Sequence, residues 1–318
     1  MSVVVDDPRT PFLASLDIPS CRIEFTNQPV VLLCGGFVPG PKPAPDAPDP
    51  PIASLRHAIS NAYPSFEIFR PEDIQNWHGD AVFKDLVSFE RELASICSLI
   101  VIVVESPGSM VELGAFSQLE EIAEKSIAIC SSRFIDDVSF INLGILRFMK
   151  SKAPSRVKSY PWEISRPNEI STEVVNDVVS DVRDELDKLP KTATFGVDHY
   201  SHCMVMITEL LRYFVALREQ EILQYLSACG FVVGSDQLRG KLFLLKSFRI
   251  IKTQTYSDAT FYVLGEEKFH RLRLAAKDRE KTIDSLRIEV LCLEFYASDN
   301  RQKNRHRAIT QLRSGGTR

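Results

Sequence analysis

Short apolar runs alternate with helical patterns over roughly the first 190 residues of the chain. The runs cover residues 29–34, 66–69, 98–104, 126–130 and 157–162. The run 98–104 does not alternate apolar with polar residues, which is typical of a strand buried on both faces, as in a parallel sheet. Helical segments separate them, and the last of these runs from about Ser171 to Leu189. This order predicts an α/β fold with a doubly wound parallel sheet.

The pattern changes near residue 198. Two helical segments, at about 198–218 and 219–229, precede a third that Ser235 can cap. Two segments rich in β-branched residues, 249–256 and 259–264, then predict a hairpin. Helices followed by a hairpin are typical of a winged helix. A long final helix carries an apolar stripe that we interpret as an intramolecular packing surface, consisting of Ile283, Leu286, Val290 and Leu293.

These patterns divide the chain into four predicted parts. Residues 1–28 form a lead-in, 29–190 the sheet domain, 198–298 a mainly helical winged-helix domain, and 299–318 a basic tail that we expect to be mobile. The Pro-rich segment 39–51 can be neither helix nor sheet. We interpret it as a surface insertion in the sheet domain, with a flap over the ligand as the alternative.

Composition narrows the class of protein. The 318 residues are enough for two domains, and 44% hydrophobic with 25% charged residues is typical of globular proteins. A net charge of −4 predicts that any contact with nucleic acid is local. The seven cysteines lack C-x-x-C spacing, which favours buried thiols over a metal site. With no apolar run of membrane-spanning length and no signal peptide pattern, we expect a cytoplasmic protein.

The segment Glu105–Ser117 carries the clearest chemical signal. It follows the strand 98–104, so Glu105 is predicted at the carboxyl end of that strand, where ligands bind in open α/β sheets. Pro107 ends the strand, Ser109 is the expected cap, and Glu112 then falls in the first turn of a helix. An ionised carboxylate there suits the nucleophile of a glycosyl transfer. The alternative is a capping box in which Glu112 only bonds the Ser109 amide.

Other candidates follow strands at the same edge. Gly35 and Gly36 would let a sugar or phosphate approach the backbone, or they are plain turn glycines. Glu72 and Asp73 follow the second strand, with a solvated loop pair as the alternative. The full set of predicted substrate-binding residues is Cys34, Gly35, Gly36, Glu72, Asp73, Ser106, Gly108, Ser109 and Asn142.

Five segments together resemble a known group of proteins. They are Leu33-Cys34-Gly35-Gly36, Pro71-Glu72-Asp73, the segment 105–117, Phe140-Ile141-Asn142 with Gly144 and Arg147, and Ser285-Leu286-Arg287-Ile288-Glu289. This set resembles the effector proteins of bacterial retron defence systems whose N-terminal domain is nucleoside 2-deoxyribosyltransferase-like. The resemblance covers most of residues 30–150 and is weaker near 285. The insertion 39–51 departs from it.

The resemblance implies an N-glycosidase. Glu112 would attack the anomeric carbon, the base would leave, and water would release the sugar. Glu105 would bind ribose hydroxyls or orient Glu112, or it would only end a strand. Asn142 would contact substrate, also across a subunit interface, although a structural function is favoured for an Asn before a turn. The resemblance favours NAD as substrate, with no cofactor, because nicotinamide leaves as a neutral base and needs little protonation.

The resemblance also implies partners. These are a retron reverse transcriptase and its branched DNA–RNA product (msDNA with msrRNA), which would hold the effector inactive until a phage trigger, and further copies of the chain in a homo-oligomer. The predicted nucleic-acid contacts are Arg239, Lys241, Lys246, Arg249 and Lys252, with a solvated basic face or a protein-docking surface as the alternative. Two other functions stay open: a nucleotide-sensing winged-helix DNA-binding regulator without turnover, and a salvage deoxyribosyltransferase.

Overall fold

The computed structural model describes residues 6–40, 44, 46–62, 64–74 and 82–315. Within these, the chain forms two compact units. The sheet unit contains residues 28–74 and 85–189, and the terminal unit contains residues 6–27, 82–84 and 190–315. The sheet unit is therefore inserted, in sequence, between parts of the terminal unit.

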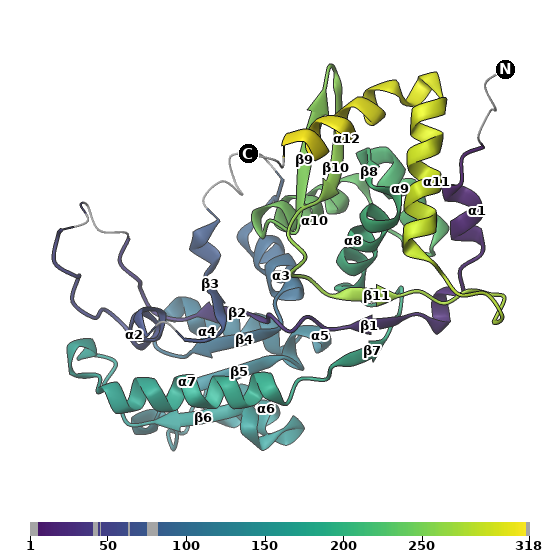
Figure 1. Ribbon diagram of the computed structural model, residues 1–318. Coiled ribbons are helices and arrows are strands. Elements are labelled where there is room, and N and C mark those ends of the chain that lie inside the picture. The colour runs from purple at the N-terminus through teal and green to yellow at the C-terminus, as the bar shows by residue number, and fades with distance from the viewer. Residues whose placement is uncertain (1–5, 41–43, 45, 63, 75–81, 316–318) are drawn as a thin grey trace. The chain divides into compact units, whose positions relative to one another are not determined.

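The sheet unit is built on a five-stranded parallel sheet with the strand order β3-β2-β4-β5-β6 (Figure 1). The strands are β2 Val30–Cys34, β3 Glu67–Phe69, β4 Leu99–Val103, β5 Ser126–Ser131 and β6 Val157–Tyr160. The chain steps from β2 to β3 on one side and then to β4 on the other. This reversal makes the carboxyl ends of β2 and β4 a topological switch point, the usual ligand site of such sheets.

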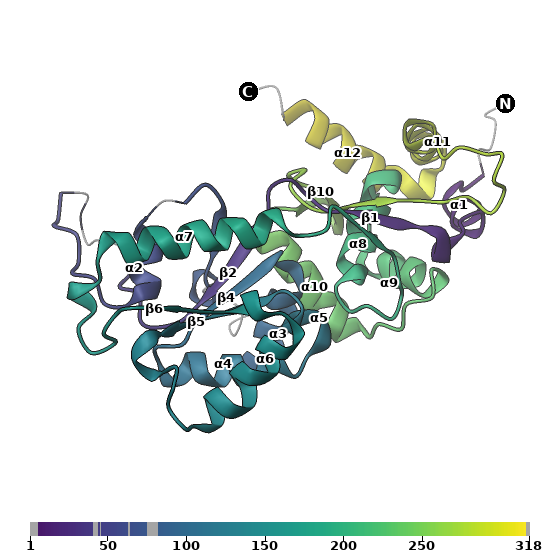
Figure 2. The same cartoon turned by 90° about the horizontal axis from the view of Figure 1, so that it is seen from below.

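Helices cover both faces of this sheet, as Figure 2 shows from below. The sheet-unit helices are α2 Leu55–Asn61, α3 Leu86–Ile96, α4 Pro107–Ser117, α5 Glu120–Ala123, α6 Arg147–Lys152 and α7 Thr172–Asp187, and the short turns include η2 Pro71–Asp73, η3 Ser132–Phe134, the π-helix η4 Ile141–Leu146, η5 Pro154–Arg156 and η6 Pro167–Glu169. Helices α2 and α7 share one core with the strands. Every residue of β4 is buried, which confirms the parallel α/β fold predicted from the unbroken apolar runs.

The terminal unit contains the predicted helices and hairpin. In chain order they are α8 His202–Phe214, β8 Ala216–Leu217, α9 Glu219–Ala228, α10 Ser235–Ser247, β9 Ile251–Tyr256 and β10 Ala259–Leu264. Strands β8, β10 and β9 form one antiparallel sheet in the order β8-β10-β9. A second antiparallel sheet has the order β11-β1-β7, and its strands are β1 Arg22–Glu24, β7 Thr192–Thr194 and β11 Arg271–Arg273. The remaining elements are α1 Arg9–Ala14, η1 Ile18–Ser20, α11 Ser285–Ser298, η7 Asn300–Gln302 and α12 Lys303–Gly315.

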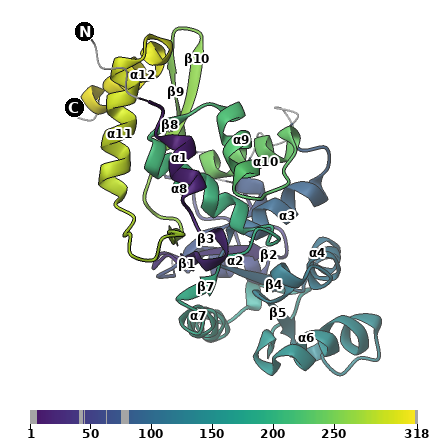
Figure 3. The same ribbon diagram turned by 90° about the vertical axis from the view of Figure 1, so that its right-hand side faces the viewer.

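Both ends of the chain differ from the sequence-based expectation. The lead-in supplies α1 and β1 to the terminal unit, and the tail expected to be mobile forms α12, which lies against the hairpin (Figures 1 and 3). The physical reason is a buried ion cluster. Arg9 and Arg305 are 4% and 3% exposed, and their guanidinium groups contact the Glu221 carboxylate at 2.8 and 2.6 Å. Two buried cations thus share one anion on α9.

The packing stripe predicted for the final helix is wrong for Leu286 and Val290, whereas Ile283 and Leu293 are partly buried. Leu286 and Val290 are 71% and 51% exposed, whereas Cys292, Phe295 and Tyr296 are buried. The Tyr296 hydroxyl donates to the Phe214 carbonyl at 2.9 Å, so the helix turns its larger aromatic side chains inward.

Three further sequence-based expectations concern absences. Within the described part of the chain, every helix is too short or too polar to cross a membrane, and no group of three metal-binding side chains is found. All seven cysteines are buried and free. Residues 41–43 and 45 of the Pro-rich segment lie outside the described residues, and its described residues form neither helix nor strand.

Candidate active site

Glu105 lies two residues beyond β4, at the switch point. Its carboxylate accepts hydrogen bonds from the backbone amides of Gly36 (3.0 Å), Leu55 (2.8 Å) and Arg56 (3.0 Å). Burial raises the pKa of Glu105, and these three hydrogen bonds oppose the rise. The carboxylate therefore fixes the loop after β2 to the start of α2. This is a positioning function, and direct contact of Glu105 with substrate stays a prediction.

The two glycines after β2 are required by the packing of the chain itself. A Cβ on Gly36 would lie 2.7 Å from the Ser54 Cβ, and one on Gly35 would lie 2.9 Å from the Arg56 Cβ. Any side chain here would displace α2. Approach of a phosphate or sugar to these glycines stays a prediction.

The N-cap of helix α4 lies three residues earlier than predicted. Ser106 is the N-cap: its hydroxyl accepts from the Ser109 amide at 3.1 Å, and the Ser109 hydroxyl accepts from the Ser106 amide at 3.1 Å. Pro107 occupies the first helical position, where its fixed φ and missing N–H are favoured. Glu112 therefore lies in the second turn, and the alternative in which it closes a capping box is wrong.

The other residues of this turn hold α4 in place. The Ser109 side chain is fully buried, and the Ser106 hydroxyl donates to the Gly35 carbonyl at 3.2 Å. Gly108 differs, because a Cβ there would meet only the Ser106 hydroxyl, at 3.8 Å. Packing thus accounts for the two serines and gives no reason for the glycine.

Glu112 projects a carboxyl oxygen that the protein does not use. Its Oε2 is buried and has no hydrogen-bond partner among the described residues. Burial raises the pKa of Glu112, while the Arg56 charge and a hydrogen bond with the Cys34 thiol lower it. Cys34 itself is fully buried at the end of β2, and burial raises its pKa well above the usual value. A buried carboxylate with one free oxygen beside a cation is suited to covalent catalysis.

Arg56 is a site residue that the sequence analysis missed. It is 7% exposed, and its guanidinium donates to the carbonyls of Leu33 (2.9 Å) and Gly36 (3.3 Å) and to the Glu72 carboxylate (2.7 Å). A lone cation between the apolar residues of α2 was the signal that could have indicated it. Glu72 thus belongs to the site through Arg56, whereas Asp73 pairs with Arg70 at 2.6 Å.

Glu90 on α3 is the second missed residue. Burial, and then repulsion by Glu112, raises the pKa of Glu90 to about 7. Among charges, Arg56 acts most strongly on Glu112, and Glu112 acts most strongly on Glu90. Glu112 therefore ionises first, and Glu90 keeps its proton to near neutral pH. No motif or spacing marks Glu90 in the sequence.

Asn142 lies in the π-helix η4. Its side-chain amide donates to the carbonyls of Phe134 (2.6 Å) and Asp137 (2.8 Å), so it holds the preceding loop. This supports the structural interpretation favoured from the sequence, and contact with substrate stays a prediction.

The predicted nucleic-acid residues of the terminal unit separate into two groups. Lys241 is 1% exposed, with its Nζ 3.6 Å from the centre of the Tyr200 ring, so it is not available to phosphates. This corrects the prediction, because Lys241 lies on the buried face of α10. Arg239 pairs with Glu219 at 3.0 Å. Lys246, Arg249 and Lys252 are exposed, and their contact with nucleic acid stays a prediction.

Comparison of the sequence with known proteins identifies the family of the chain. Over 142 residues the chain is 35% identical to an Escherichia coli protein named "Retron Ec86 putative ribosyltransferase/DNA-binding protein", covering 41% of each chain. Over 68 residues it is 34% identical to the correspondingly named protein of retron Ec73, covering 21% of this chain and 22% of the relative. The matches thus span about two fifths or less of these relatives. The model of the STM3845 retron effector protein family matches residues 52–253, more than half of the chain, and the chain therefore belongs to this family of retron effectors.

Proposed function

We propose that the chain is the toxic effector of a retron anti-phage defence system and acts as an N-glycosidase that cleaves the nicotinamide–ribose bond of NAD. The observation that carries the proposal is the free, buried Oε2 of Glu112 at the switch point, beside Arg56. The names of the two curated relatives, which include ribosyltransferase, support glycosyl transfer as the reaction class.

The reaction would proceed in two displacements. The Glu112 carboxylate attacks the anomeric carbon, an ester bond forms, and the bond to nicotinamide breaks. Nicotinamide departs with the electron pair of that bond and is neutral, so no proton is needed. Water then attacks the anomeric carbon, the ester breaks, and Glu112 is regenerated as ADP-ribose leaves.

Glu90 would act in the second displacement. Esterified Glu112 carries no charge, so the repulsion that helps to raise the pKa of Glu90 disappears in the intermediate. Glu90 then ionises more readily and can take the proton of the attacking water. Glu112 would thus be the nucleophile and Glu90 the general base.

Glu90→Gln is expected to slow hydrolysis about 10²–10³-fold while sparing the first displacement. Purified protein should then release a burst of one nicotinamide per site, and intact-protein mass spectrometry should detect a retained ADP-ribosyl group. The native rate should fall at acid pH, where Glu90 is protonated, with a midpoint below 7 because esterified Glu112 no longer repels the Glu90 charge, and the variant should lose this dependence. A rate that instead falls above this pH would indicate proton donation to the leaving group and would contradict NAD as substrate.

The nucleotide pool of bacteria expressing the chain tests the activity itself. Mass spectrometry should show loss of NAD with appearance of nicotinamide and ADP-ribose, relative to an empty vector. Loss of another nucleotide would retain the mechanism and replace the substrate. If the pools change only when the retron partners and a phage are present, the partners restrain the enzyme. Stoichiometric ligand binding with no product under any of these conditions would favour the alternative function, a nucleotide-sensing DNA-binding regulator without turnover.

The terminal unit is proposed to bind the partners. Its order α8-β8-α9-α10-β9-β10, with the sheet β8-β10-β9, supports the winged helix predicted from the sequence. The names of the relatives include DNA-binding, which supports a nucleic-acid partner. This unit would bind the retron reverse transcriptase and its msDNA, and these partners would hold the effector inactive.

A further inference from the structure

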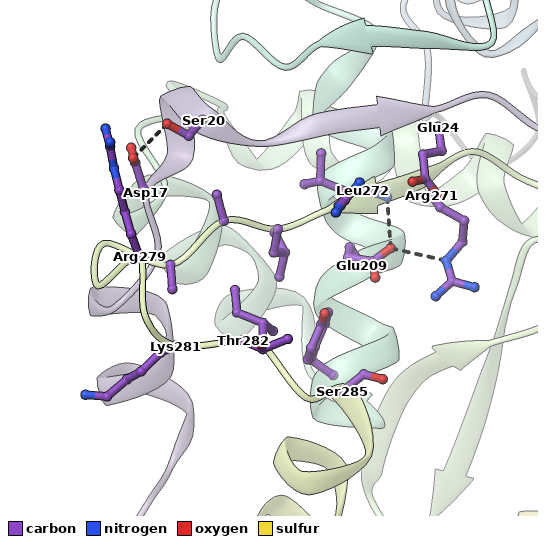
Figure 4. Close-up of a pocket in the computed structure, with 16 residues that line it drawn as sticks. Asp17, Ser20, Glu24, Glu209, Arg271, Leu272, Arg279, Lys281, Thr282 and Ser285 are labelled. Atoms are coloured by element: carbon purple, nitrogen blue, oxygen red, sulfur yellow. Dashed lines mark hydrogen bonds and ion pairs between the residues drawn. The ribbon is translucent and has the colours of Figure 1, made fainter.

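A cleft of about 710 Å³ lies wholly within the terminal unit. It is lined by the segment after α1, by α8, and by β11 and the loop that leads from it to α11 (Figure 4). Four of its lining residues are basic: Arg271, Arg273, Arg279 and Lys281. Three other lining residues are acidic, Asp17, Glu24 and Glu209, so the charge offered to a ligand depends on which cations the protein itself neutralises.

Two of the four cations are compensated. The Arg271 guanidinium lies 3.8 Å from the carboxylate of Glu209, which is 2% exposed and also accepts from the Leu272 amide at 3.3 Å. Lys281 pairs with Asp278 at 3.2 Å. Glu209 thus neutralises the Arg271 end of the cleft, and Asp278 neutralises Lys281 at the other end (Figure 4).

The other two cations are not compensated. Among the described residues, no carboxylate lies within 4.0 Å of the guanidinium of Arg273 or Arg279. Directly opposite Arg273 in the sheet is Arg22 on β1, whose guanidinium donates to the Thr194 hydroxyl at 3.3 Å. Like charges placed opposite each other destabilise a sheet. An anion bound between them would relieve this repulsion.

We propose that Arg22, Arg273 and Arg279 bind the phosphate groups of a nucleic-acid strand. The planar guanidinium forks match phosphate oxygens. The three cations are distributed over β1, β11 and the following loop, which suits the repeating charge of a backbone better than one isolated phosphate. Tyr213, the one aromatic side chain among the described residues that line the cleft, is only 7% exposed, so this lining offers no platform for stacking bases. Binding should therefore depend on charge and little on sequence.

This inference rests on the proposed partner function, and it places the contact on the β1–β11 surface in place of α10. It does not depend on catalysis. The variant Glu112→Gln is accordingly expected to bind nucleic acid like the native chain, so failure of the proposed enzyme activity and failure of this inference are distinguishable.

Fluorescence anisotropy with a labelled single-stranded DNA of mixed sequence tests it. The double variant Arg273→Gln/Arg279→Gln should bind about tenfold more weakly. Its slope of log affinity against log salt should be shallower by about 1.4, since each phosphate contact to a single strand contributes about 0.7. Arg287→Gln/Lys303→Gln removes the same charge from exposed positions of α11 and α12 and should bind like the native chain.

Several results would overturn the proposal. These are no binding by the native chain, or an equal loss in the Arg273/Arg279 and Arg287/Lys303 variants. A loss in Lys246→Gln/Lys252→Gln with none in the Arg273/Arg279 variant would return the contact to α10 and β9. Displacement of the DNA by polyglutamate at equal charge concentration would indicate that the ligand of this surface is an acidic protein segment and not a nucleic acid. Because the substituted arginines are exposed, matching thermal unfolding curves should show that the variants are folded.

Discussion

Glu112→Gln is expected to reduce glycosidic cleavage by roughly 10⁴-fold or more, because the amide cannot form the ester that the mechanism requires. The fold should be unaffected. Burial raises the pKa of Glu112, which means that the folded protein disfavours its charge, so a neutral side chain of the same shape fits at least as well. Nicotinamide release by purified protein and thermal unfolding measure the two effects.

The matched control is Glu173→Gln, which changes an exposed carboxylate of α7 in the same unit. It should leave both activity and unfolding unchanged. A folded Glu112→Gln protein with native activity would show that Glu112 is not the nucleophile, and Glu90 or Glu105 would then be the candidate.

Arg56→Met is expected to destabilise the protein by about 1–3 kcal/mol, the usual effect of leaving buried hydrogen-bonding groups without partners. Glu72, whose side chain is 48% exposed, regains contact with water when Arg56 is removed. Methionine replaces the apolar stem and leaves the Leu33 and Gly36 carbonyls without their guanidinium donors. It also removes the cation that lowers the pKa of Glu112 and Glu90. The loss of stability should therefore be larger at alkaline pH, where both carboxylates are charged, than at acid pH.

Urea unfolding at two pH values measures this prediction. Arg183→Met, on the exposed face of α7, is the control and should shift the unfolding free energy by less than about 0.5 kcal/mol. Arg56→Lys should recover part of the stability through its charge, but not the hydrogen bonds of the fork. Equal stability of Arg56→Met and the native chain would show that Glu72 and the two carbonyls are satisfied without Arg56.

Unbroken apolar runs sufficed to predict the sheet, because a strand buried on both faces has no polar positions. The edge that carries Glu105 and Glu112 followed from the direction of those strands. The start of α4 could not be predicted, since Ser106 and Ser109 are equally good caps and Pro107 decides between them. The place of Arg56 and Glu90 in the site could not be predicted for a different reason. Each is a single polar residue whose function depends on neighbours that only the fold brings together.

Helix faces in the terminal unit were harder to predict. The sequence of the final helix offers two apolar faces, and contacts with α8 decide which one is buried. Lys241 illustrates the same difficulty for charge, because its position on a buried face is set by tertiary packing.

The insertion of one unit into the other imposes an order on assembly during synthesis. Strand β1 has no partner until β7 and β11 are made, and Arg9 meets Glu221 only after 212 further residues. Closing a flexible loop of that length costs about 5 kcal/mol of chain entropy, and a folded sheet unit shortens the loop. All the sheet unit's strands precede β7 in the chain. The unit that carries Glu112 is thus complete on the ribosome before the unit proposed to restrain it.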